Sequence, residues 1–239
     1  MFFKYARTRV QYKFSRKKSG DVLVMLHGWQ CDINSFKMLE SLKRKYRVLE
    51  VSFPPFGKSS EPINWNVFSY ANMIISLCEH LNIKKAHFLG HSFGGRVSIL
   101  VSVIQPELVG RLILVDSAGM KPRRKISYYI KTAKYKIKKK LGMNISKLGS
   151  MDYVSLSPNM KKVFSSIVST HLDEYASMIK QKTLIVFGEN DKETPLYMAR
   201  RLNKLIKNST LVVMEECSHF CFQEKPYEFC KIVKSFLRS

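Results

Sequence analysis

Short apolar runs alternate with longer segments of helical periodicity along most of the chain. The short runs predict buried strands and are residues 22–26, 47–53, 86–89, 111–115, 183–187 and 211–214. Between several of these runs, apolar residues recur at the spacing of a helix, as in residues 32–46 and 65–81. Residues 2–14 predict one or two edge strands. This alternation of strands and helices predicts an α/β protein with a doubly wound, mostly parallel sheet.

The alternation stops between residues 119 and 182. Within this segment, residues 126–141 carry apolar side chains at helical spacing, and lysines occupy the other faces. The Ser157-Pro158 pair is typical of a helix start, and we expect a second amphipathic helix after it. We therefore expect a helical cap at residues 119–182, inserted into a core domain of residues 1–118 and 183–239. Both helices are expected to pack on the core domain or line its pocket rather than contact a membrane.

The turn at residues 90–94 has the sequence Gly-His-Ser-Phe-Gly, which fits the G-x-S-x-G pattern of a nucleophile elbow. In such a turn the backbone of Ser92 is strained, so its hydroxyl stands clear of the strand and the helix. A side chain at position 90 or 94 would collide with the neighbouring chain. The alternative is a glycine-rich joint with an incidental serine. The apolar strand before the turn and the helix after it favour a nucleophile.

A serine hydroxyl needs a base to become a nucleophile, and the base needs an acid that orients it. Asp191 and His219 each follow a predicted strand, as Ser92 does. The carboxyl ends of parallel strands share one edge of the sheet, where α/β proteins place their sites. The three side chains are therefore expected to meet there. Asp116 also follows a strand and is the alternative acid.

The first central strand ends in His27-Gly28-Trp29, which suits a loop that donates an N–H group to a developing oxyanion. Together these four pieces resemble the α/β-hydrolase superfamily, especially its small serine hydrolases with a helical cap, over nearly the whole chain. The resemblance implies the α/β-hydrolase fold, with Ser92 as nucleophile, His219 as base and Asp191 as acid. It also implies an oxyanion hole formed by the backbone N–H groups of Trp29 and Phe93.

One loop departs from the pattern of that superfamily. Where members often have D-x-P-G-x-G-x-S, this chain has Ser-Phe-Pro-Pro-Phe-Gly-Lys-Ser at residues 52–59. Ser52 replaces the usual aspartate and Pro55 the usual glycine, which changes the expected shape of the loop but not the triad. His27 and His91 lie in tight loops beside glycine or serine, and we expect them to support backbone rather than act as bases.

Composition bears on compartment and partners. The five cysteines are scattered and odd in number, which predicts reduced thiols in a cytoplasmic protein. Charges at Lys4 and Arg7 interrupt the start of the chain, so no signal peptide is expected, and no apolar run has the length of a transmembrane segment. Cys217, His219 and Cys221 supply too few ligands for a zinc site, so neither a metal nor a cofactor is expected.

The formal net charge is +23, and cations concentrate in residues 121–147, which contain no Asp or Glu. This basic stretch is either a solvated face or a surface for an acidic carrier protein, an anionic membrane surface or an anionic substrate. Nucleic acid is not expected, because no recognition motif accompanies the charge.

A serine nucleophile with an oxyanion hole predicts acyl transfer to water. We expect a carboxylesterase that cleaves a carboxylic ester or thioester of a small-molecule acyl substrate. One alternative is an esterase acting on an acyl chain carried by an acidic acyl carrier protein. An alternative of another class is a non-catalytic binding protein with the same fold, although a binding role would not need all three triad residues.

Overall fold

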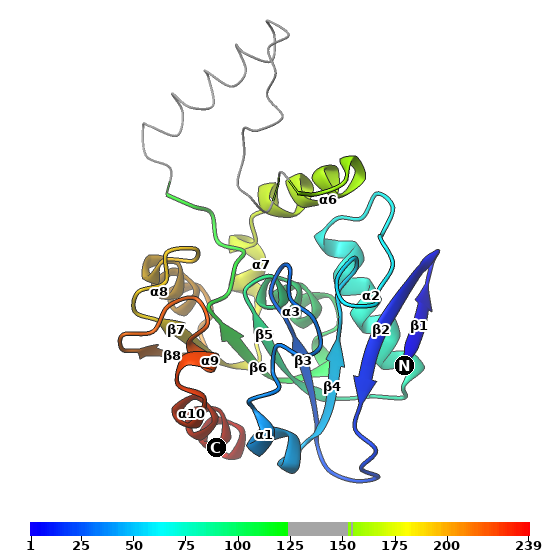
Figure 1. Ribbon diagram of the computed structural model, residues 1–239. Coiled ribbons are helices and arrows are strands. Elements are labelled where there is room, and N and C mark those ends of the chain that lie inside the picture. The colour runs from blue at the N-terminus through cyan, green and yellow to red at the C-terminus, as the bar shows by residue number, and fades with distance from the viewer. Residues whose placement is uncertain (124–152, 154) are drawn as a thin grey trace, which may run out of the picture.

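The computed structural model describes residues 1–123, 153 and 155–239 (Figure 1). This part of the chain contains an eight-stranded sheet. Its strands are β1 (Phe2–Tyr5), β2 (Thr8–Phe14), β3 (Val22–Leu26), β4 (Arg47–Val51), β5 (Ala86–His91), β6 (Val109–Val115), β7 (Lys182–Gly188) and β8 (Ser209–Met214). The spatial order is β1-β2-β4-β3-β5-β6-β7-β8. β2 pairs antiparallel with β1 and β4, and the other pairs are parallel, which confirms the predicted sheet.

The helices of the described residues lie on both faces of this sheet (Figure 1). They are α1 (Glu40–Lys45), α2 (Val67–His80), α3 (Phe93–Ile104), the 3₁₀ helix η1 (Pro106–Leu108), α6 (Pro158–Ser169), α7 (Asp173–Met178), α8 (Leu196–Leu205), α9 (Cys221–Glu224) and α10 (Pro226–Arg238). Residues of α2, α3, α6, α7 and α8 belong to one hydrophobic core, and residues of α1, α9 and α10 to a second. The fold therefore has three layers, with the sheet in the middle.

Side chains of the central strands alternate between the two cores, because successive residues of a strand point to opposite faces. In β3, Val24 and Leu26 belong to the first core, whereas Leu23 and Met25 belong to the second. All five residues of β3 are buried. Burial on both faces explains why the central strands appear in the sequence as continuous apolar runs.

The predicted helix over residues 32–46 is wrong for its first half, because α1 covers only Glu40–Lys45. The preceding residues form successive turns held by local side chains. The carboxylate of Asp32 accepts from the backbone N–H of Asn34 over 2.8 Å, and the hydroxyl of Ser35 donates to the Asp32 carbonyl over 2.7 Å. Such side-chain bonds to nearby backbone offer the chain an alternative to the helical pattern.

The segment between β6 and β7 contributes α6 and α7, and α6 is the highest of the labelled elements in the view of Figure 1. The predicted helix start is confirmed, since the Ser157 hydroxyl accepts from the N–H of Met160 over 3.1 Å. Met160, Val163 and Ile167 of this helix are buried, whereas Val168 is 44% exposed. The other predicted helix and nearly all of the basic stretch lie outside the described residues, so the division into core and cap stays a prediction.

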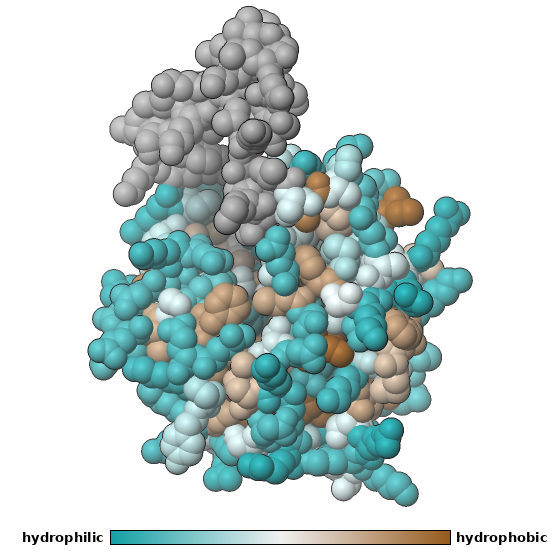
Figure 2. All heavy atoms as spheres, viewed as in Figure 1, coloured by the Kyte–Doolittle hydropathy of each residue, from teal (hydrophilic) through white to brown (hydrophobic). Residues whose placement is uncertain are grey.

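Hydrophilic residues cover much of the face shown in Figure 2, with hydrophobic residues gathered toward its middle. None of the helices described here is long and apolar enough to cross a bilayer.

Candidate active site

Ser92 lies between the end of β5 and the first residue of α3, with dihedral angles of φ 50° and ψ −109°. This region is unfavourable for a residue with a side chain, and neighbouring glycines make it possible. A Cβ atom on Gly90 would overlap the carbonyl of Gly94, and one on Gly94 would overlap the carbonyl of Leu26. The strand, the turn and the helix therefore pack too closely for any other residue at these two positions.

Three predicted site residues meet at the carboxyl edge of the sheet. The hydroxyl of Ser92 lies 3.0 Å from Nε2 of His219, and Nδ1 of His219 lies 2.8 Å from Oδ2 of Asp191. Because an ionised carboxylate only accepts, Nδ1 carries the imidazole proton and Nε2 is left to accept from Ser92. Asp191 and His219 are buried. The arrangement can move a proton from the serine hydroxyl to the imidazole.

The carboxylate of Asp191 receives further hydrogen bonds from its own loop. Its Oδ1 accepts from the backbone N–H groups of Glu193 and Thr194, over 2.8 Å and 3.0 Å. The Thr194 hydroxyl lies 2.6 Å from Oδ2 of Asp191. Burial alone would raise the pKa of Asp191, but the bonds from His219 and Thr194 outweigh it and lower that pKa. Asp191 therefore stays ionised beside the imidazole.

Thr194 is a site residue that the sequence interpretation missed. An Asp followed three residues later by Thr and then Pro is typical of an Asx turn leading into a helix, and this signal was available in the sequence. The Thr194 hydroxyl also lies 3.0 Å from the carbonyl oxygen of Asp116. Thr194 thus ties the loop of Asp191 to the end of β6.

The electrostatic surroundings of His219 favour its protonated form. Burial would lower the pKa of His219, but the hydrogen bond to Asp191 and the charge of that carboxylate raise it above the ordinary value. Glu193 adds to this effect, since its Oε2 lies 3.4 Å from Nε2 of His219. The Glu193 side chain is 70% exposed, so water screens much of its charge.

Asp116, the alternative acid, has a different partner. Its Oδ1 accepts from the backbone N–H of Gly188 over 2.8 Å, whereas His219 is bonded to Asp191. Asp116 is fully buried, and burial raises its pKa to about 7. Such a group is a poor permanent anion at neutral pH.

His27 and His91 support backbone, as predicted. Nδ1 of His27 donates to the carbonyl of Gly28 over 2.7 Å, and its Nε2 accepts from the N–H of Phe53 over 2.9 Å. Nε2 of His91 donates to the carbonyl of His219 over 2.8 Å. Burial lowers the pKa of His27 to about 4 and that of His91 to about 3, so both rings are neutral near pH 7.

The two residues predicted to form the oxyanion hole both come from segments that lie beside Ser92. A Cβ atom on Gly28 would lie 3.4 Å from the Cβ of Ser92, so the loop that carries Trp29 passes beside the serine. Phe93 follows Ser92 directly and opens α3. The ring centroids of Trp29 and Phe93 are 5.4 Å apart. Whether their N–H groups bind an oxyanion stays a prediction.

Aromatic rings surround Trp29 beside the serine. Its ring centroid lies 4.9 Å from that of Phe56, 5.4 Å from that of Phe93 and 5.1 Å from that of Phe164. We call these four residues the aromatic wall. Phe56 comes from the loop that departs from the superfamily pattern, and Phe164 comes from α6. The loop after β4 and helix α6 thus both contribute aromatic rings that contact Trp29.

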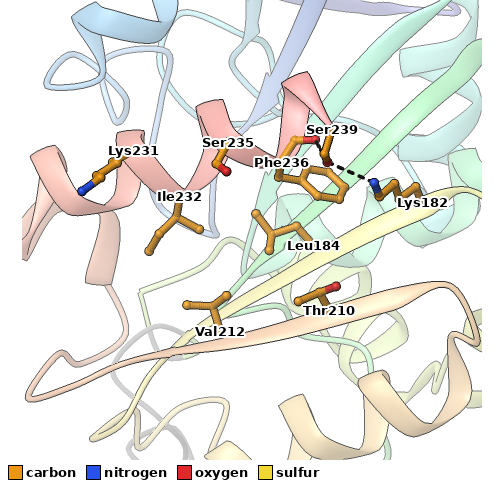
Figure 3. A pocket seen from close by; sticks show the side chains of 9 residues that line it. All are labelled: Lys182, Leu184, Thr210, Val212, Lys231, Ile232, Ser235, Phe236 and Ser239. Atoms are coloured by element: carbon orange, nitrogen blue, oxygen red, sulfur yellow. Dashed lines mark hydrogen bonds between the residues drawn. The ribbon is translucent and has the colours of Figure 1, made fainter.

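The rest of the described chain contains a further cavity but no cluster of metal-binding side chains. No group of three or more His, Cys, Asp or Glu side chains among the described residues could hold a metal ion. A separate cavity of about 570 Å³ lies between β7, β8 and α10 (Figure 3). Its floor is largely apolar, with Lys182 and Lys231 among its lining residues, and it does not include Ser92, Asp191 or His219.

Comparison with known proteins places these features in context. A family model described as alpha/beta hydrolase fold matches residues 21–134. The chain is 25% identical to an uncharacterized hydrolase, YugF, of Bacillus subtilis, covering 96% of this chain and 94% of the relative. It is 24% identical to a 2-hydroxy-6-oxo-2,4-heptadienoate hydrolase of Pseudomonas putida, covering 92% and 90%. The crystal structure of an enol-lactonase from Burkholderia xenovorans superposes with a TM-score of 0.80 at 18% identity, covering 100% of both chains.

Proposed function

Because this chain belongs to the α/β-hydrolase superfamily, we propose that it is a serine hydrolase that cleaves a carboxylic ester or thioester. Ser92 is the nucleophile in this proposal, His219 the base and Asp191 the orienting acid. The observation that carries it is the continuous hydrogen-bond chain from the Ser92 hydroxyl through both ring nitrogens of His219 to Asp191. The proposal needs no metal or cofactor, since these side chains supply both nucleophile and base.

The reaction proceeds through an acyl-enzyme. Oγ of Ser92 attacks the carbonyl carbon while Nε2 of His219 takes the hydroxyl proton. The imidazolium then gives this proton to the leaving alcohol or thiol as its bond to the acyl carbon breaks. A water molecule, deprotonated by His219, attacks the acyl-enzyme, and the returning proton restores the Ser92 hydroxyl. Asp191 holds the imidazole in the required tautomer and stabilises its charged form.

The carbonyl oxygen becomes negatively charged during each attack, and backbone N–H groups stabilise such charge strongly. We assign this role to the N–H groups of Trp29 and Phe93. This assignment is supported by where the two residues lie. Phe93 begins α3 directly after Ser92, and the Gly28-Trp29 loop passes beside the serine. The amino end of α3 adds a favourable dipole.

The surroundings of the serine favour a neutral, apolar acyl group. The aromatic wall offers an apolar surface, and the exposed carboxylate of Glu193 beside Nε2 of His219 disfavours an anionic group there. An acyl chain on an acidic carrier protein stays an alternative. The basic stretch that suggested it, residues 121–147, lies almost wholly outside the described residues.

The test is hydrolysis of p-nitrophenyl esters from acetate to dodecanoate by wild type, Ser92→Ala and the matched control Ser102→Ala. The Ser102 hydroxyl lies in the same helix but bonds to the carbonyl of Ser98. Ser92→Ala should lower kcat on the order of 10⁴-fold, whereas Ser102→Ala should stay near wild type. A Ser92→Ala enzyme with a tenth of wild-type kcat would exclude this nucleophile.

The same experiment also tests the alternative that this chain is a non-catalytic binding protein. Wild-type protein that hydrolyses no ester of the series, and whose Ser92 is not labelled by a fluorophosphonate, would indicate a binding protein with a hydrolase fold. A fluorophosphonate adduct on Ser92 that disappears in His219→Ala would support the proposed proton transfer even if the natural ester lies outside the series.

A further inference from the structure

The helix α6 supplies part of the aromatic wall and is itself packed against the core. Met160, Val163 and Ile167 of α6 are buried in the first hydrophobic core. Phe164, on the next part of the helix surface, packs its ring against Trp29 with a centroid distance of 5.1 Å. The position of α6 therefore determines where one side of the wall lies.

The amino end of α6 is held by an acidic residue from the loop after β4. Oε1 of Glu61 accepts from the hydroxyl of Ser157 over 2.7 Å and from the side-chain amide of Asn159 over 2.9 Å. The same amide also donates to the carbonyl of Pro62 over 2.7 Å. A carboxylate at this position faces the positive end of the helix dipole. Glu61 therefore stabilises the amino end of α6 both by accepting hydrogen bonds and by its negative charge.

The carboxyl end of α6 is held by a basic residue from α3. The guanidinium of Arg96 donates to the carbonyl oxygens of Ile167 and Thr170, which lie in the last turn of α6 and at its end. The Ile167 carbonyl also accepts from the backbone N–H of Thr170 over 3.3 Å. A cation at this end of the helix faces the negative end of its dipole. Arg96 is only 7% exposed, and burial lowers its pKa to about 10, so it stays charged at neutral pH.

Arg96 lies one helical turn after the serine. Its backbone N–H donates to the carbonyl of Ser92 over 3.1 Å. Within the described residues no carboxylate forms an ion pair with Arg96. There its guanidinium donates instead to the backbone carbonyls at the end of α6. The first turn of α3 therefore begins at the serine and also carries the side chain that anchors α6.

We propose that Glu61 and Arg96 are positioning residues that hold α6 at its two ends, and that the resulting place of Phe164 sets which acyl groups the site accepts. The second half of this statement rests on the proposed esterase function. A long acyl chain needs the completed aromatic wall, whereas an acetyl group contacts little of it. Loss of either anchor lets α6 shift and weakens binding of long chains more than of short ones.

The test compares Arg96→Met and Glu61→Gln with the matched control Arg111→Met. Arg111 also donates from its guanidinium to a helix carbonyl, that of Phe236 in α10 over 2.6 Å, but the helix lies on the other face of the sheet. The ratio of kcat/KM for p-nitrophenyl octanoate to that for the acetate should fall about tenfold in the first two variants, mainly through KM. Arg111→Met should keep the wild-type ratio. An unchanged ratio in folded Arg96→Met and Glu61→Gln would overturn the proposal.

A second measurement does not depend on hydrolysis. Trp29 and Trp65 are the two tryptophans of the chain, so a Trp65→Phe background reports Trp29 alone. Acrylamide should quench Trp29 fluorescence more strongly in Arg96→Met and Glu61→Gln than in Arg111→Met, because Phe164 no longer covers the indole. If the wild type cleaves no ester, the proposed function fails, and this quenching still decides whether the two residues position α6. Equal quenching in all variants would refute that positioning. Glu61 is exposed, so Glu61→Gln keeps the test open if Arg96→Met does not fold.

Discussion

Nε2 of His91 donates a hydrogen bond to the backbone carbonyl of His219 over 2.8 Å, and the two rings lie 4.9 Å apart. A neutral, buried ring thus fixes the backbone of the residue that carries the proposed base. We expect His91→Phe to lower kcat for ester hydrolysis about tenfold or more, with a smaller change in KM. His91→Gln, which keeps an N–H donor, should recover part of the loss. Equal kcat in His91→Phe and wild type would show that this bond does not position His219.

The choice between the two candidate acids is tested by substitution with asparagine. Asp191→Asn should lower kcat on the order of 10⁴-fold, because the imidazole loses the carboxylate that holds its tautomer. Asp116→Asn should keep most of the activity, since the side chain of Asp116 bonds to the backbone of Gly188 rather than to His219. The measurement is kcat for one p-nitrophenyl ester, and the reverse order of the two variants would move the acid to Asp116.

The stability of the fold should depend on pH through Asp116. Its pKa is raised from 3.8 to about 7 in the folded chain, so the native state holds a proton that the unfolded state releases. Stability from this group is complete below about pH 4 and is lost as pH rises toward 7, by roughly 4 kcal/mol at most. Urea unfolding at pH 5 and pH 8 should show, in wild type, the part of this loss that occurs above pH 5. Asp116→Asn has no such proton and should lose less, and an equal loss in both would contradict the expectation.

Glu193 should shift the pH dependence of catalysis. The base must be neutral, so kcat/KM falls as pH drops through the pKa of His219, which lies above its ordinary value. Glu193→Gln removes a carboxylate 3.4 Å from Nε2 and should move this acid limb to lower pH. High salt should reduce the difference from wild type. Glu216→Gln removes the same charge elsewhere on the surface and should leave the limb in place. A shift of equal size in both variants would point to net charge alone.

Much of the sheet and the central geometry of the site follow from local sequence. Buried parallel strands appear as apolar runs, and Ser92, Asp191 and His219 each lie in the loop or turn that follows such a run. Because the carboxyl ends of parallel strands share an edge, this pattern predicted that the three side chains would meet, and the resemblance to the superfamily favoured Asp191 over Asp116 as the acid. The roles of Gly90 and Gly94 could also be predicted, because the turn that they belong to leaves no room for a Cβ atom at either position.

Contacts between distant segments could not be predicted in this way. Arg96 bonds to carbonyls more than seventy residues away, and a lone cation in an apolar helix does not reveal its partner. Glu193 is one of many exposed acids until the fold brings it to His219. The missing first half of the helix over residues 32–46 has a local cause, because Asp32 and Ser35 bond to nearby backbone at positions that apolar spacing does not register.

The place of β5 in the middle of the sheet has a consequence for how the molecule opens. β3 and β6 flank β5, and the amide of Ser92 donates to the carbonyl of Val115 over 3.0 Å. Local fluctuations begin where few bonds must break, as at the edge strands β1 and β8. The Ser92 amide should therefore exchange its hydrogen for deuterium only when the whole sheet comes apart. The strained backbone of Ser92 would then belong to the part of the chain that is slowest to exchange.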